Sequence, residues 1–123
     1  MRTVINLCFI LCVATAAVFA HHSPVVFDRT KDVKLVGVVK EFKWVNPHSW
    51  IELTVRNEKG ETEPWSVEMT SPNQLVKGGW KSTTVKNGDE ITVIVHPLRS
   101  GEKVGQFVSV TLADGKVLTD RAN

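Results

Sequence analysis

Histidine is the residue type in this chain that says most about chemistry, because an imidazole can bind a transition metal or carry a proton near neutral pH. Two of the four histidines stand side by side as His21-His22, one lies in the run Trp44-Val45-Asn46-Pro47-His48-Ser49-Trp50, and the last is His96. The run around His48 places an imidazole between two indoles at a corner that proline fixes. We expect the rest of the chain to position this corner.

The first 20 residues have the three parts of a secretory signal peptide. Arg2 supplies the positive charge, Val4 to Val18 form an apolar segment, and Val18-Phe19-Ala20 provides small residues before the cleavage site. The apolar segment is short for a membrane span and polar sequence follows it, so we expect cleavage and no membrane insertion afterwards. The mature chain is then residues 21–123, which is enough for one domain.

Both cysteines, Cys8 and Cys12, lie in the expected signal, and each follows a leucine instead of the small residue of a lipoprotein signal. The mature chain is therefore predicted to have no thiol, disulfide or covalent lipid. Removal of Arg2 leaves 14 basic against 13 acidic residues. The net charge is too close to zero to indicate the basic surface that is typical of nucleic-acid-binding proteins, so we expect no nucleic-acid partner.

Apolar residues that recur at every second position predict strands along most of the mature chain. In the first run, Val33 to Trp44, apolar residues fall on both parities, so the strand is expected to be buried on different faces along its length. Gly37 is either a bulge that switches faces or a glycine without a packing role. The core-facing residues of the next three strands are predicted to be Ile51, Leu53 and Val55; Trp65, Val67 and Met69; and Ile91, Val93 and Val95. A fifth strand is predicted over Val108, Val110 and Leu112, with Val117-Leu118 as a short edge.

A short helix is expected after Ser71, because serine at the cap is followed by Pro72 at the first helical position and by Gln74 three residues on. Gly78-Gly79 ends it after about two turns. Three strands, a short helix and two strands, with a long first strand, is the element order of an OB-fold. The predicted fold is all-β, a five-stranded OB-like barrel with one short helix between strands 3 and 4.

Motifs that carry a family resemblance run through the whole mature chain. They are His21-His22-Ser23, Phe27-Asp28, Trp44-Val45-Asn46-Pro47-His48, Trp65-Ser66-Val67-Glu68, Ser71-Pro72, Gly79-Trp80, Asn87-Gly88-Asp89 and Leu112-Ala113-Asp114-Gly115. In these motifs the chain resembles a family of small exported proteins of Gram-negative bacteria that is known as a domain of unknown function. The resemblance implies a periplasmic location and the barrel, and it brings no activity with it.

A hairpin turn centred near Lys59 predicts the register of the second and third strands. Antiparallel partners then place Trp50 opposite Glu68 and His48 opposite Thr70 on the outer face. We therefore expect His48, Trp50 and Glu68 in one cluster. In the structural alternative, the His48 ring donates to a nearby backbone carbonyl and packs on Trp44.

A chain that begins with histidine offers its α-amino nitrogen and the Nδ1 of the same residue as a chelate. A second imidazole completes a set of three nitrogen ligands, which suits Cu(II). We hypothesise a copper site formed by His21 and His48, with His96 or Glu68 as a further ligand. Alternatively, His21 is only the residue that follows the cleavage site. A Cu(I) chaperone is disfavoured, since Met69 is the one mature methionine and is expected to point inward.

Trp44 and Trp50 flank the corner and are candidate ligand-binding side chains, since an indole has an apolar face and a polar edge. The alternative function is therefore a metal-free interaction module that presents Trp44, Trp50 and Phe107 to an envelope protein or glycan. The structural interpretation makes both indoles half-buried covers of an open barrel end. No cofactor fingerprint occurs, and neither Ser49 nor Ser66 has the glycines of a nucleophile elbow, so an enzyme is not expected.

Overall fold

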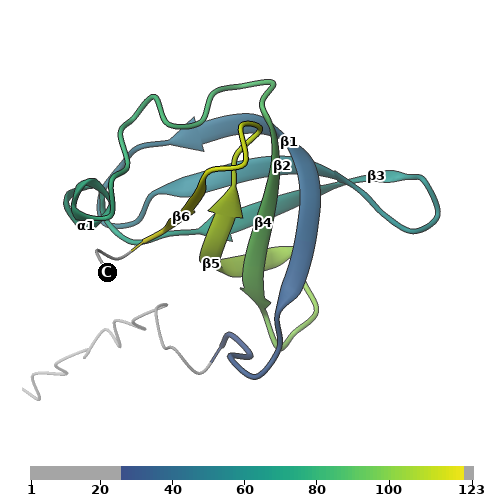
Figure 1. Cartoon of the computed structure of the whole chain (residues 1–123). Helices are drawn as coiled ribbons and strands as arrows, with labels where there is room; N and C mark the ends of the chain where they lie inside the picture. The colour runs from purple at the N-terminus through teal and green to yellow at the C-terminus, as the bar shows by residue number, and fades with distance from the viewer. Residues whose placement is uncertain (1–25, 121–123) are drawn as a thin grey trace, which may run out of the picture.

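The computed structural model describes residues 26–120. The expected signal peptide, its cleavage site and the His21 ligand lie outside this range, so those predictions remain predictions. Within the range the elements follow one another as β1 (Val33–Lys43), β2 (Trp50–Arg56), β3 (Thr62–Glu68), α1 (Pro72–Lys77), β4 (Glu90–Pro97), β5 (Val104–Thr111) and β6 (Val117–Thr119) (Figure 1).

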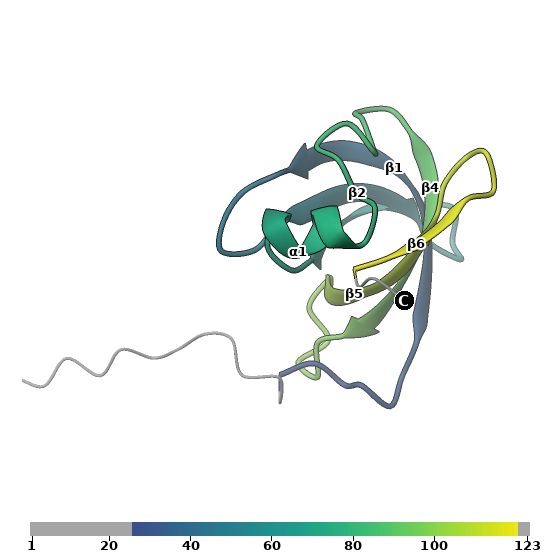
Figure 2. The same cartoon turned by 60° about the vertical axis from the view of Figure 1, so that its left-hand side comes forward.

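The first five strands close into a barrel. Hydrogen-bonded neighbours run in the order β3-β2-β1-β4-β5, and β5 then pairs in parallel with β3. The short β6 adds to β5, and α1 lies across one end of the barrel (Figure 2). The strand order confirms the predicted OB-like barrel with one helix between its third and fourth strands.

The β2–β3 hairpin has the predicted register. Trp50 pairs with Glu68 and Ile51 with Val67. The far end of the hairpin projects from the barrel (Figure 1). Since alternate side chains of a strand point to opposite faces, this register places Ile51 and Val67 in the core and Trp50 and Glu68 outside.

The switch of faces in β1 lies after Gly37. The register between β1 and β2 shifts between Val39 and Glu41, which marks a bulge. Gly37 instead allows two strands to approach, since a Cβ at this position would lie 2.7 Å from the carbonyl oxygen of Thr54. The glycine has a packing reason, and the bulge is a separate feature that the sequence pattern did not locate.

Several apolar residues of the strands lie outside the core. Val36 and Val38 precede the β1 bulge and are 57% and 39% exposed. In β5, the register with β4 shifts so that Val108 has no partner in the ladder, and this residue is half-buried. The same shift turns Phe107 into the core, where it is 4% exposed. The prediction of Phe107 as an exposed binding residue is therefore wrong.

The helix agrees with its sequence signals. The Ser71 side chain accepts a hydrogen bond from the Gln74 amide, and Leu75 of α1 is buried. Trp80 fills the space below the helix, where its indole N–H donates to the Thr119 carbonyl at 2.8 Å. In residues 26–120 there is no helix of the length and apolar character needed to cross a membrane.

Candidate functional site

The corner between β1 and β2 contains a cis Asn46-Pro47 peptide bond. After it, the amide of Ser49 donates to the Thr70 carbonyl at 3.1 Å, and the Ser49 carbonyl accepts from the Met69 amide at 2.9 Å. These bonds continue the β2–β3 ladder beyond the strands. They place His48 beside the residues that follow β3.

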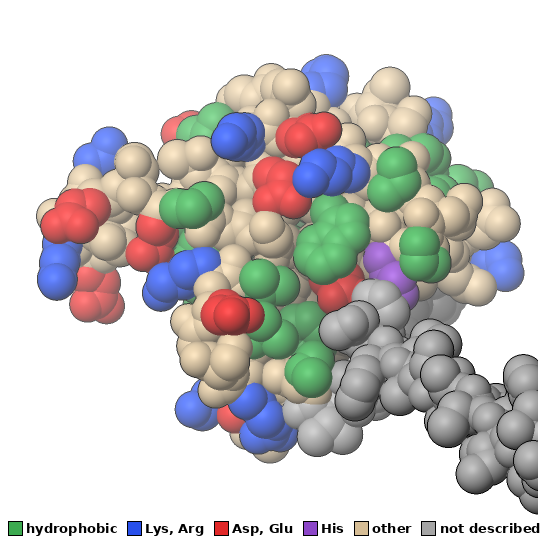
Figure 3. Space-filling model, turned by 180° about the vertical axis from the view of Figure 1, so that it is seen from behind, with side chains coloured by type: hydrophobic (Ala, Val, Ile, Leu, Met, Phe, Trp, Pro, Cys, Tyr) green, Lys and Arg blue, Asp and Glu red, His purple; other side chains and the backbone are tan. Residues whose placement is uncertain are grey.

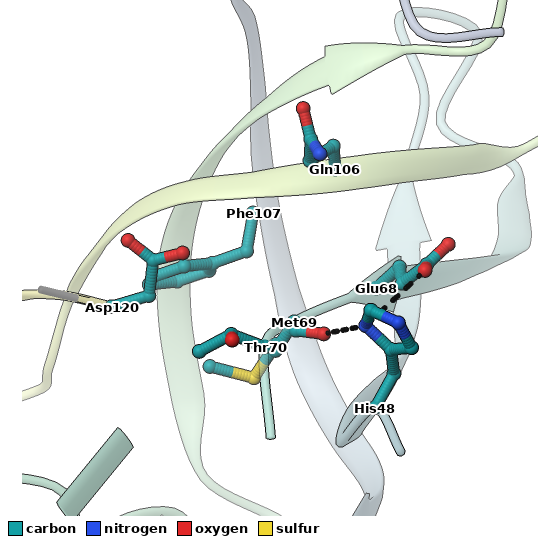
Figure 4. Close-up of a pocket in the computed structure, with 7 residues that line it drawn as sticks. All are labelled: His48, Glu68, Met69, Thr70, Gln106, Phe107 and Asp120. Atoms are coloured by element: carbon teal, nitrogen blue, oxygen red, sulfur yellow. Dashed lines mark hydrogen bonds and ion pairs between the residues drawn. The ribbon is translucent and has the colours of Figure 1, made fainter. Parts of the chain in front are cut away.

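The His48 ring is held by the end of β3. Its Nδ1 lies 2.8 Å from the carbonyl oxygen of Met69 and 3.5 Å from Oε1 of Glu68 (Figure 4). A carbonyl oxygen can only accept, so Nδ1 carries the proton, and in the neutral ring Nε2 carries the lone pair. The structural alternative predicted such a bond to a backbone carbonyl. The same tautomer, with Nδ1–H bound to a carbonyl or carboxylate, is also usual in metal-binding histidines.

His48 and Glu68 line a groove of about 180 Å³ at the end of the barrel. Their side chains are 32% and 14% exposed, so both are accessible to solvent. Figure 4 shows Asp120 across the groove from His48, with Gln106 on β5. The full lining is His48, Glu68, Met69, Thr70, Gln106, Phe107 and Asp120. Two carboxylates thus line the groove together with the imidazole.

His96 lies in an adjoining groove. On β5, Gln106 pairs with Glu68 of β3 on one side and with His96 of β4 on the other. The second groove, of about 260 Å³, is lined by Arg29, His96 and Val108 and shares the other lining residues, Gln106, Phe107 and Asp120, with the first. The structure thus brings both histidines to one end of the barrel, which the sequence alone did not predict.

The predicted ligands are distributed over these two grooves. His48 and Glu68 are in contact, whereas Nδ1 of His96 faces the carbonyl oxygen of Lys31 at 3.0 Å. Among the residues that the structure describes, no group of three or more His, Cys, Asp or Glu side chains could hold a metal ion. A copper site at His48 therefore needs a ligand from outside the described range, as His21 would be.

The two tryptophans of the corner differ in environment. Trp50 is half-buried on the outer face, between Lys43 of β1 and Glu68 of β3. Trp44 packs edge to face on Phe42, with ring centroids 5.7 Å apart, and covers the core. Figure 3 shows hydrophobic, acidic and basic side chains next to one another on one face of the molecule, with a histidine beside them.

A polar network on the outer face was not predicted from the sequence. The Ser66 hydroxyl donates to Oε2 of Glu52 at 2.6 Å, and the Lys43 ammonium donates to Oε1 at 3.2 Å. Both carboxylate oxygens therefore accept hydrogen bonds within the sheet. The predicted register of the β2–β3 hairpin pairs Glu52 with Ser66, and the network could have been inferred from this pair. The Glu52 side chain is 24% exposed, so this network belongs to a solvated face of the sheet.

A strap, residues 26–32, precedes β1 and crosses the end of β4. Phe27 is buried and bridges to Leu98. The Asp28 amide donates to the Pro97 carbonyl at 2.8 Å, and the Arg99 amide donates to the carbonyl of the first strap residue at 2.9 Å. These bonds fix the start of the strap on the barrel.

Asp28 stabilises the turn inside the strap. The hydroxyl and then the amide of Thr30 donate to its carboxylate, and the charges of Arg99 and Lys31 lie nearby. Together these contacts hold the pKa of Asp28 below its ordinary value of 3.8, with the Thr30 hydroxyl as the largest cause.

Comparison with known proteins gives a family and a fold. A model described as a family of unknown function (DUF6152) matches residues 8–107. No curated protein matches the chain. Among solved structures, the chain is similar to Rim1, a mitochondrial single-stranded DNA binding protein from S. cerevisiae, at 14% identity and a TM-score of 0.50, over 68% of this chain and 94% of that one. At this identity the likeness supports the OB-fold and no activity.

Proposed function

The chain belongs to the DUF6152 family of unknown function, and from its geometry we propose that it is an exported periplasmic binding protein whose groove at His48 holds Cu(II). His21, as the first residue of the processed chain, supplies its amine and imidazole nitrogens. The observation that carries the proposal is the hydrogen bond from Nδ1 of His48 to the Met69 carbonyl. This bond makes Nε2 the nitrogen with a lone pair for the metal.

Glu68 supports the same site through charge. Its carboxylate oxygen Oε1 lies 3.5 Å from Nδ1 of His48. A carboxylate this close to the ring offsets part of the positive charge of a cation bound there. Glu68 then acts on the metal through His48, and direct ligation by Glu68 is not needed.

The strap supports the contribution of His21. Val26 is fixed on the barrel by its bond to the Arg99 amide. Five residues, 21–25, lie before it, and an extended chain covers up to about 3.5 Å per residue, or about 17 Å in all. The span from β4 across β5 to β3 is two strand spacings, about 10 Å. The chain is therefore long enough for His21 to reach the groove.

The test compares two samples, one that begins at His21 and one with an extra residue before it. The extra residue turns the terminal amine into an amide and removes the chelate. In a Cu(II) titration followed by calorimetry and copper EPR, affinity should fall at least tenfold, about 1.4 kcal/mol. His48→Ala in the first sample should also weaken binding, with His22→Ala as the matched imidazole control. Equal, weak binding in both samples that His48→Ala does not change would contradict the proposal.

The proposal also requires a defined start. The intact mass of the exported protein should correspond to a chain that begins at His21. A species that begins at His22 or Ser23 has no such chelate, and the copper proposal would then fail whatever the fold.

A second function, binding of an envelope protein or glycan without metal, is favoured by the position of Trp50. Its half-buried indole lies between Lys43 and Glu68 on the outer face, and an aromatic surface flanked by polar groups suits such ligands. Quenching of tryptophan fluorescence by soluble cell-wall glycan fragments would test it. Trp50→Ala should abolish the quenching by these fragments, while Trp44→Phe should preserve it.

Single-stranded DNA binding, for which Rim1 is named, is not proposed for this chain. Such sites combine a basic groove with stacked aromatic side chains. The outer face of β2 and β3 carries Glu52 and Glu68, and the Lys43 ammonium on the adjacent strand is bound to Glu52. Fluorescence anisotropy with a labelled oligothymidylate is expected to show no binding.

A further inference from the structure

The second groove, beside His96, adjoins the proposed copper site and supplies none of the nitrogen ligands proposed there. Its volume is about 260 Å³. Two side chains of opposite charge line it, Arg29 from the turn of the strap and Asp120 from the residue after β6. In residues 26–120 the Arg29 guanidinium takes part in no hydrogen bond or ion pair. A cationic group is therefore available to a ligand in this groove.

Gln106 lies between the two grooves and lines both. Its neighbour on β3 is Glu68, whose carboxylate lies 3.5 Å from the His48 ring. Its neighbour on β4 is His96, whose Nδ1 lies 3.0 Å from the Lys31 carbonyl oxygen. Both neighbours thus have partners, whereas the half-buried Gln106 amide has none within the described part of the chain. This amide offers an acceptor and two donors to a ligand.

The polar groups of the second groove are three acceptors and one cation. Because the Lys31 carbonyl can only accept, the neutral His96 ring donates from Nδ1 and keeps its lone pair on Nε2. The Gln106 amide oxygen is the second acceptor. The Asp120 carboxylate is the third; it has a contact within the chain, and a carboxylate has room for about four hydrogen bonds.

These groups complement a ligand that has both an ammonium and a carboxylate. An ammonium has three donors and no acceptor, which suits three acceptors. A carboxylate accepts two parallel hydrogen bonds from a guanidinium. The remaining lining is apolar and includes Val108, which is half-buried. A small apolar side chain on the ligand would contact it.

We propose that the second groove binds an α-amino acid with a small apolar side chain, its carboxylate at Arg29 and its ammonium at Asp120. Gln106 and His96 accept the other two ammonium protons. This site uses neither copper nor the chain before the strap, so it goes beyond the proposed function and stands or falls without it.

A sugar is the other small ligand that makes many hydrogen bonds, and two features disfavour it in this groove. The aromatic residue in the lining, Phe107, is 4% exposed and presents no open ring face to a sugar. A neutral sugar would also take water from Arg29 and Asp120 without returning a charge to either. A zwitterion gives each of them a partner of opposite charge.

The first test titrates L-valine into the protein after removal of metal, since amino acids themselves chelate Cu(II). In NMR spectra the Gln106 side-chain amide and the Val108 backbone amide should shift, with a Kd below about 1 mM, and the Val39 amide should not. Isovalerate lacks the ammonium and isobutylamine lacks the carboxylate, so each should bind about tenfold more weakly or worse. No shift with L-valine, or equal binding of all three ligands, would overturn the proposal.

The second test changes the cation of the groove. Arg29→Gln should weaken L-valine binding by about tenfold or more, and Arg29→Lys should have an intermediate effect, because lysine keeps the charge and loses the paired donors. Arg56→Gln is the matched control, an exposed arginine on β2 that should bind L-valine normally. Unchanged L-valine affinity in Arg29→Gln would show that the carboxylate does not lie at Arg29, and the proposal would be wrong.

The third test changes the anion. Asp120→Asn should weaken L-valine binding and should not weaken the binding of isovalerate, which has no ammonium to lose. Equal losses for both ligands would mean that Asp120 shapes the groove without binding the ammonium, against the proposal. N-acetylglucosamine is the neutral probe, and shifts at Gln106 and Val108 with this sugar but not with L-valine would make the groove a sugar site instead.

Discussion

The wall of the barrel and the grooves at its end use the same strands but different contacts. In the wall, Ile51, Val67 and Val93 are fully buried, and their neighbours on adjacent strands surround them. In the grooves, His48 and His96 are each held by a bond from Nδ1 to one backbone carbonyl. The wall should therefore determine stability, and the grooves should accept substitution without unfolding.

Truncation in the wall should have the largest effect. Val93 is 0% exposed, so Val93→Ala removes buried methyl groups and leaves a cavity, at an expected cost of about 2 kcal/mol or more in the free energy of unfolding. Urea denaturation measures this cost. Copper affinity, measured well below the transition, should stay unchanged, and a parallel loss of affinity would mean that wall and grooves are not separable.

The helix cap should have an intermediate effect. Ser71 accepts the Gln74 amide at the start of α1, and Ser71→Ala leaves that amide without its partner. The expected loss of unfolding free energy is about 1 kcal/mol, again from urea denaturation. Ser71→Asp keeps an acceptor at the cap and is the control that should retain stability. A loss as large as that of Val93→Ala would mean that the helix has a larger role in the wall.

How much the sequence could predict depends on how far apart the interacting residues lie along the chain. The hairpin register and the helix cap involve neighbouring segments, so alternation and capping signals were sufficient for both. The two bulges, near Val39 and at Val108, result from closing the barrel, and no local pattern marks them. For that reason Phe107 was predicted on the outside of the barrel, whereas it is buried.

The grooves depend on contacts between distant segments. The parallel pairing of β3 with β5 brings Gln106 beside Glu68, and the strap reaches His96 across 65 positions of sequence. Residue types indicated that His48 and Glu68 could act together. The residue types did not indicate that His96 lies in the next groove. The alternation of side chains along one strand does not tell which two strands pair to close the barrel.

His48→Ala should reduce the free energy of unfolding less than Val93→Ala or Ser71→Ala. His48→Ala removes one hydrogen bond to a carbonyl near a solvent-accessible groove, where water can replace it, so the expected cost is below about 1 kcal/mol. Copper affinity should nevertheless fall at least tenfold. Denaturation and titration of the same sample measure both. A loss of stability as large as that of Val93→Ala would make His48 a structural residue.

The smallest expected effect concerns Asp28 and the pH dependence of the strap's attachment to the barrel. The pKa of Asp28 in the folded protein lies below the ordinary value of 3.8, mainly because of the hydrogen bond from the Thr30 hydroxyl. Because the pKa of Asp28 is lower in the folded protein than in the unfolded chain, its ionised carboxylate stabilises the folded protein above about pH 3.8. This stabilisation is lost as the pH falls through the pKa of the folded protein. The strap should therefore lose amide protection in acid before the wall does.

Protection factors for the Asp28 and Lys31 amides, compared with that of Val39, measure this difference as the pH is lowered from about 5 to about 3. Asp28→Asn keeps an oxygen that accepts from Thr30 but has no carboxylate to titrate, so its strap should be weaker at pH 5 and much less sensitive to acid. Asp32→Asn is the matched control, because it removes a second carboxylate of the strap, the one that lies beside His96. If Asp28→Asn shows the same acid-dependent loss as the unchanged protein, another group controls the strap; if only Asp32→Asn removes that loss, the group is the carboxylate beside His96.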